Sequence, residues 1–166
     1  MFEKLKNLFG GAKEAAITGI LSPVQGKAVS LREVPDPTFS EEMLGKGVAI
    51  VPTVGRIVAP AAGKVLGIFR TCHAITLQTE SGAELLIHIG IDTVKLDGVH
   101  FTPHVKKGDQ VQVGDLLIEM DLEAIQAAGY NTITPVLVCN VDDFTAIEGV
   151  LGDVNEGDLI VKLNKK

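Results

Sequence analysis

Tryptophan is absent from this 166-residue chain, tyrosine occurs once, and aromatic residues make up only 4% of the sequence. The two cysteines, Cys72 and Cys139, are too few for the disulfide framework of a small secreted domain. Basic residues are outnumbered 15 to 21, which gives a formal net charge of −6. Because a surface that binds nucleic-acid phosphates needs a dense excess of Lys and Arg, we expect no nucleic-acid partner.

Long hydrophobic runs are also missing, since no stretch reaches the ~18 consecutive apolar residues that a membrane span requires. The first ten residues lack the apolar core and small-residue cleavage site of a signal peptide. Hydrophobic residues nevertheless make up 46% of the chain and charged residues 22%, a composition typical of a folded domain. These features predict a cytoplasmic protein.

The N-terminal residues 1–9 have an amphipathic pattern. On a helix, their apolar side chains fall within an arc of roughly 120°, and Gly10-Gly11 would end that helix. A short helix packed on the domain and a frayed end are two interpretations; the third is peripheral contact with the inner face of the cell membrane. We therefore divide the chain into an amphipathic segment with its linker, residues 1–17, and a domain, residues 18–166.

Two internal repeats indicate the fold class. Ile20-Leu-Ser-Pro23-Val-Gln-Gly26-Lys27 returns 37 residues later as Ile57-Val-Ala-Pro60-Ala-Ala-Gly63-Lys64, and Gly108-Asp…Gly114-Asp is echoed by Gly152-Asp…Gly157-Asp. Glycine-rich turns between Val-rich and Leu-rich runs are typical of antiparallel strands. We expect an all-β antiparallel sandwich or barrel-like fold with an internal pseudo-repeat. Only two short segments after the linker are expected to be helical, about residues 41–44 and 122–127.

The chemistry concentrates in one predicted hairpin, residues 69–90. If Glu80-Ser81 forms its loop, His73 stands directly opposite His88, and opposed side chains lie ≈ 4.5–5.5 Å apart. A three-residue loop would instead pair Ala74 with His88. Two neighbouring imidazoles titrate as a coupled pair and resist double protonation. Such a pair suits phosphoryl transfer, with one ring as nucleophile and the other as support, and it also suits a metal.

The segment Thr71-Cys-His73-Ala-Ile, followed by Glu84-Leu-Leu-Ile-His88-Ile-Gly90-Ile-Asp92-Thr-Val94, resembles the glucose-type enzyme IIA of the bacterial phosphoenolpyruvate-dependent sugar phosphotransferase system. The resemblance covers nearly the whole chain. It implies a β-sandwich with a shallow apolar active site. It also implies a phosphoryl carrier that accepts phosphate from the histidine-containing phosphocarrier protein and passes it to a cysteine of enzyme IIB of a glucose-family transporter.

The resemblance assigns roles residue by residue. It makes His88 the phosphoacceptor through Nε2, His73 the supporting histidine, and Thr71 the residue that orients His73. The carbonyl of Gly90 would accept the Nδ1 proton of His88. The expected partner-binding residues are two acidic ones, which would meet an arginine of the phosphocarrier, and four apolar ones: Asp36, Asp92, Phe39, Phe69, Leu86 and Val94.

Other interpretations of the same residues stay open at this point. No cofactor is expected to be required, but His73 and His88 would bind zinc together with a partner's carboxylate. A zinc hydrolase of related β-architecture is the main alternative. Such a site requires a His-x-His element, and this chain has His88-Ile-Gly90 there, so one ligand is missing. A lipoyl-type carrier lacks the usual lysine turn, and a metal pair of His100 and His104 is a weaker candidate still.

Overall fold

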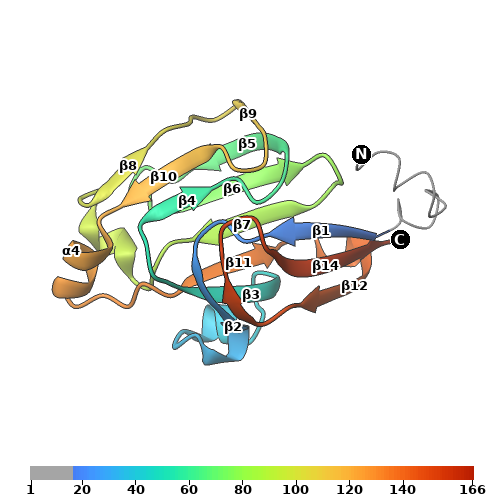
Figure 1. The fold of residues 1–166 in the computed structure, drawn as a ribbon, viewed down its shortest axis with the longest axis horizontal. Helices are drawn as coiled ribbons and strands as arrows, with labels where there is room; N and C mark the ends of the chain where they lie inside the picture. The colour runs from blue at the N-terminus through green and yellow to red at the C-terminus, as the bar shows by residue number, and fades with distance from the viewer. Residues whose placement is uncertain (1–16) are drawn as a thin grey trace.

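The computed structural model describes residues 17–166, so the predicted amphipathic segment and linker lie outside it except for Ile17, which begins the first strand. Almost all of the regular structure is strand, and every strand pairing is antiparallel (Figure 1). The all-β prediction is therefore confirmed. Within residues 17–166, no helix is long and apolar enough to cross a membrane.

The largest sheet has eight strands in the order β13-β2-β3-β11-β7-β6-β5-β9. Its strands, in chain order, are β2 (Gly26–Ser30), β3 (Lys46–Pro52), β5 (Gly63–Ile68), β6 (Ala74–Thr79), β7 (Glu84–His88), β9 (Gln110–Val111), β11 (Thr134–Val138) and β13 (Gly152–Val154). Four of its central strands are rich in Val, Ile and Leu, as expected for strands that are buried on both faces.

Two three-stranded sheets complete the sandwich. One consists of β1 (Ile17–Leu21), β14 (Leu159–Lys165) and β12 (Phe144–Gly149); the other consists of β4 (Arg56–Val58), β10 (Leu116–Met120) and β8 (Phe101–Pro103). Figure 1 shows them at opposite ends of the molecule, the first beside the C-terminus and the second beside the helix α4 (Leu122–Ala127).

Among residues 17–166 the short helices are α3 (Pro37–Ser40), α4, and three 3₁₀ turns: η1 (Leu31–Glu33), η2 (Thr93–Leu96) and η3 (Val141–Asp143). The helix predicted at 122–127 is confirmed, and Gly129 follows it with a positive φ of 93°. The helix predicted at 41–44 is wrong, because those residues form turns and bends. The actual helix begins earlier, where Asp36 caps it and Pro37 supplies a preformed first position.

The two halves of the repeat hold each other through reciprocal hydrogen bonds. The Leu21 amide donates to the Pro60 carbonyl (3.0 Å), and the Val58 amide donates to the Pro23 carbonyl (2.8 Å). The next residue of each half is also bonded in an equivalent way: the Ser22 amide donates to the Asp158 carbonyl, and the Ala59 amide donates to the Asp115 carbonyl. The predicted pseudo-repeat is therefore present in space as well as in sequence.

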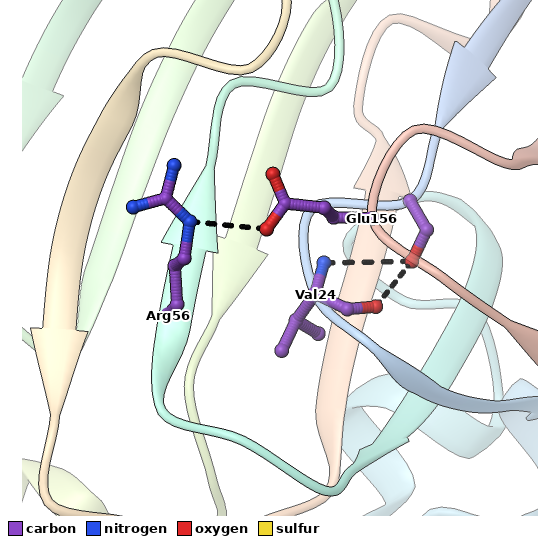
Figure 2. A network of polar contacts seen from close by, with 4 residues as sticks. Val24, Arg56 and Glu156 are labelled. Carbon is purple, nitrogen blue, oxygen red and sulfur yellow. Dashed lines mark hydrogen bonds and ion pairs between the residues drawn. The ribbon is translucent and has the colours of Figure 1, made fainter.

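A polar cluster at this junction joins β4 to the turn before β14. Arg56 Nε lies 3.0 Å from Glu156 Oε1, and beside this pair Val24 takes part in hydrogen bonds through its main chain (Figure 2). Both charged side chains are substantially exposed, so their ion pair contributes little to stability.

The eight-stranded sheet separates two apolar clusters. Its inner face packs against the small sheets through residues such as Ile50, Leu85, Ile87 and Val136. The alternate residues of the same strands, including Ala49, Leu86 and Leu137, face a second cluster that α3 and η1 cover with Phe39 and Leu31. Both histidines of the predicted site lie beside this second cluster, because Ala74 and Leu86 flank them in it.

Candidate active site

The two histidines come from neighbouring hairpin ends of the large sheet. His88 is the last residue of β7, and His73 is the last residue of the loop, residues 69–73, that joins β5 to β6. The predicted strand pairing of His73 with His88 is wrong, because Ala74 pairs with His88. The Thr79 amide donates to the Ala83 carbonyl, so the hairpin turn between them has three residues rather than two, and its last residue, Gly82, has a φ of 93°. His73 therefore lies just beyond the end of β6.

The imidazole rings nevertheless meet. Their centroids are 4.9 Å apart and the planes are nearly perpendicular, at 85°. The Ile89 amide donates to the His73 carbonyl at 2.7 Å, so the main chains of the two loops are joined at the same place. The expected juxtaposition of the two rings is present, although a loop residue rather than a strand residue brings one of them there.

His88 makes the predicted bond to the main chain. Its Nδ1 lies 2.7 Å from the Gly90 carbonyl oxygen, which can only accept a hydrogen bond. Nδ1 therefore carries the proton, and Nε2 is left with its lone pair available in the neutral ring. A histidine held in this tautomer presents a nucleophile.

Thr71 contacts His73 as predicted. The Thr71 hydroxyl lies 2.5 Å from His73 Nδ1, and both side chains are buried. Both residues lie in the β5–β6 loop, not on the strand expected from the sequence. The loop is tightly turned, because the Cys72 amide donates to the Phe69 carbonyl and Cys72 has a positive φ of 58°. Cys72 itself packs against the larger of the two apolar clusters.

Burial dominates the electrostatics of the pair. Burial, and to a smaller extent the neighbouring charge of His88, together lower the pKa of His73 from 6.5 to about 4. Burial also lowers the pKa of His88, against the opposing effects of the Gly90 hydrogen bond and of the Asp36 and Asp92 carboxylates. Both rings are therefore neutral near pH 7, which keeps His88 Nε2 available.

The predicted rim residues separate into exposed and buried ones. Phe69 and Val94 are 49% and 50% exposed, so they form apolar surface beside the histidines. Phe39 and Leu86 are buried; the Phe39 ring lies 4.9 Å from that of His88, and the Phe69 ring packs edge-on against His73 at 5.3 Å.

Two residues that the sequence did not single out support the main chain around His88. Thr93 is fully buried, and its hydroxyl donates to the Ile89 carbonyl at 2.5 Å. The Ile91 amide donates to the Asn131 carbonyl at 2.9 Å. Thr93 stands in the sequence between Asp92 and Val94, but no pattern there indicated its contact with Ile89, and nothing in the sequence placed residue 131 beside residue 91.

Metal ligands are few at this site. His73 and His88 could bind a zinc ion, but among residues 17–166 no group of three or more His, Cys, Asp and Glu side chains is arranged to hold one. A zinc site completed by a partner's carboxylate stays a prediction. His104 follows β8 directly, and its Nε2 lies 2.6 Å from Oε1 of Glu119 on β10, in an exposed pair.

The profile of the family described as "phosphoenolpyruvate-dependent sugar phosphotransferase system, EIIA 1" matches residues 18–144. The glucose-specific EIIA component of Halalkalibacterium halodurans is 46% identical over 89% of this chain and 88% of its own length. The beta-glucoside-specific EIIBCA component of Dickeya chrysanthemi is 51% identical over 79% of this chain, which spans only 21% of that larger protein.

A solved structure has the same architecture. The glucose permease IIA from Mycoplasma capricolum aligns with a TM-score of 0.81 at 36% identity, over 88% of this chain and 95% of that one. The histidine pair thus lies on the fold that this similarity leads one to expect. The chain belongs to the EIIA 1 family of the phosphoenolpyruvate-dependent sugar phosphotransferase system, and is a phosphotransferase component with a phosphohistidine intermediate.

Proposed function

We propose that His88 accepts a phosphoryl group on Nε2 from the histidine-containing phosphocarrier protein and passes it to a cysteine of a glucose-family enzyme IIB. The observation that supports this assignment is the Gly90 carbonyl on His88 Nδ1, which leaves Nε2 as the nucleophile. Relatives that combine EIIB, EIIC and EIIA in one named chain support the partnership with enzymes IIB and IIC.

The transfer is a displacement at phosphorus that conserves protons on His88. The Nε2 lone pair forms the new N–P bond while the bond from phosphorus to the donor's imidazole breaks, and the electron pair returns to that imidazole. His88 keeps its Nδ1 proton, bonded to Gly90, throughout. In the second step the thiolate of enzyme IIB attacks the same phosphorus, and Nε2 regains its lone pair.

His73 is the residue that steadies the phosphoryl oxygens. If the Thr71 hydroxyl donates to His73 Nδ1, the proton of that ring is on Nε2 and can be donated to an oxygen of the incoming group. Because burial keeps His73 neutral, this donation occurs without adding a second positive charge beside His88.

The surface around the pair suits a transient partner. Phe69 and Val94 provide exposed apolar contact, while Asp36 and Asp92 lie close enough to His88 to raise its pKa. An arginine of the phosphocarrier would be attracted to these two carboxylates. Such a small apolar patch with a charged edge fits partners that must exchange quickly.

The test is phosphoryl transfer from phosphoenolpyruvate through enzyme I and the phosphocarrier. Wild type should gain an acid-labile phosphate, His88→Ala should gain none, and His73→Ala should accept phosphate but donate it to enzyme IIB at least about tenfold more slowly. His104→Ala, which changes an exposed histidine paired with Glu119, is the matched control and should behave as wild type. Phosphate uptake by His88→Ala would refute the assignment.

A further inference from the structure

Gly90 supplies the carbonyl that fixes the His88 tautomer, but its own conformation has to be held in place. Its φ of 80° turns the main chain so that its carbonyl meets His88 Nδ1. A glycine has no side chain to restrict it, however, and can rotate easily to other conformations. Something else must hold this carbonyl in place.

The peptide groups on both sides of Gly90 are anchored. On one side, the Ile89 carbonyl accepts the Thr93 hydroxyl at 2.5 Å. On the other, the Ile91 amide donates to the Asn131 carbonyl at 2.9 Å. Since the peptide plane that contains the Ile91 amide also contains the Gly90 carbonyl, the carbonyl points away from Asn131 and toward the ring.

Thr93 contributes shape as well as a hydrogen bond. A Cβ built on Gly90 would lie only 2.6 Å from Thr93 Cγ2, so the threonine methyl lies close against the glycine Cα. The whole Thr93 side chain is buried. It is the one side chain of residues 17–166 for which a hydrogen bond to the Ile89 carbonyl is observed, and it arises from the η2 turn rather than from β7.

We propose that Thr93 is a positioning residue that acts through the Ile89–Gly90 peptide to hold His88 in the Nδ1-protonated tautomer. Thr93 does not touch the phosphoryl group; it fixes the acceptor that decides which nitrogen of His88 carries the proton. The inference rests on the proposed role of His88 Nε2 for its consequence on transfer, but its effect on the tautomer is independent of that role.

Two substitutions separate the hydroxyl from the methyl. Thr93→Val keeps the shape beside Gly90 and removes the hydroxyl, whereas Thr93→Ser keeps the hydroxyl and removes the methyl. With one hydrogen bond lost, we expect the ratio of the two His88 tautomers in the valine variant to shift roughly tenfold toward Nε2–H. Phosphate acceptance should slow by a similar factor, and the serine variant should restore both.

The decisive measurement is the imidazole ¹⁵N spectrum of unphosphorylated protein, which distinguishes Nδ1–H from Nε2–H and needs no phosphoryl donor. Ser22→Ala is the matched control, because Ser22 is also fully buried and its hydroxyl also donates to a carbonyl, that of Val24 (2.7 Å). It should lose a comparable hydrogen bond without changing the His88 spectrum.

A folded valine variant with the wild-type tautomer ratio would overturn the proposal. If Thr93→Val does not fold, Thr93→Cys keeps a weak donor of similar size and should give an intermediate shift; no shift there would equally overturn it. The two proposals can fail separately. If Thr93→Val shifts the His88 tautomer ratio but His88→Ala still takes up phosphate, the proposed function is refuted and the inference about Thr93 stands.

Discussion

At the scale of single residues, His73 combines deep burial with an ionisable ring. It is 3% exposed, its neighbour His88 is also lowered in pKa, and Thr71 is its hydrogen-bond partner. A ring that is held neutral for chemistry must become protonated, or the protein must unfold, as the solution becomes acidic. The site therefore contributes to the pH dependence of stability.

We predict that the free energy of unfolding decreases as the pH falls from about 6.5 toward about 4. The His73 pKa is about 4 in the folded protein against 6.5 as the ordinary value, so the unfolded chain binds more protons between these limits. The contribution of neutral His73 to the free energy of unfolding is thus fully present above pH 6.5. It is lost as the pH falls toward about 4, and amounts to roughly 3 kcal/mol at most. Urea unfolding at a series of pH values measures this slope.

His73→Gln should flatten that dependence, because it removes the ring that must become protonated. His104→Gln, at an exposed position, controls for the loss of any histidine and should leave the slope unchanged. Equal slopes in wild type and His73→Gln would show that the acid sensitivity comes from elsewhere.

The residues of the site could be predicted from the sequence, but the main-chain contacts that hold some of them in place could not. His73, His88, Thr71 and Gly90 lie within one continuous motif, so a match along the sequence was enough to place them together. Asn131 reaches Ile91 only through folding of β11 beside β7. No local pattern contains that contact.

At the scale of elements, the short helix α3 joins the acidic edge of the site to its apolar base. Asp36 accepts from the Thr38 amide at 2.9 Å, and the helix places Phe39 against His88. The same carboxylate raises the pKa of His88. Asp36 therefore has two separable effects, a cap and a charge.

We predict that Asp36→Asn and Asp36→Ala differ in stability but agree in electrostatics. Asparagine keeps a capping oxygen, so its free energy of unfolding should stay close to wild type, whereas alanine should lose about 1 kcal/mol. Both variants lack the carboxylate, so both should lower the pKa of His88 further. Thermal unfolding and NMR titration of His88 measure these effects; equal destabilisation by both substitutions would rule out the cap.

The hairpin register shows where sequence reasoning stopped. Glu80-Ser81 and Glu80-Ser81-Gly82 were both reasonable loops, and the choice shifts the pairing of every residue by one. Gly82 decides it, because its positive φ ends a three-residue loop in which the Gly82 amide bonds the Thr79 carbonyl. The rings still meet because His73 lies beyond the paired part of β6, where the register no longer constrains it.

At the scale of the whole molecule, the internal repeat predicts equivalent constraints in the two halves. Gly26 of β2 pairs with Pro52, and Gly63 of β5 pairs with Thr79. A Cβ on Gly26 would lie 2.1 Å from the Val51 carbonyl oxygen, and one on Gly63 would lie 2.1 Å from that of Gln78. The close approach of main chain to main chain is thus the same on both sides.

Gly26→Ala and Gly63→Ala should therefore destabilise the protein by similar amounts, about 1–3 kcal/mol each, because neither neighbouring carbonyl can move without disturbing its strand. Gly67→Ala is the matched control within β5, since its nearest neighbour is the Thr76 hydroxyl at 3.6 Å. That variant should retain nearly all of the wild-type stability in urea unfolding. A large cost at Gly63 with none at Gly26 would mean that the repeat in sequence imposes no equivalent constraint on the two halves of the fold.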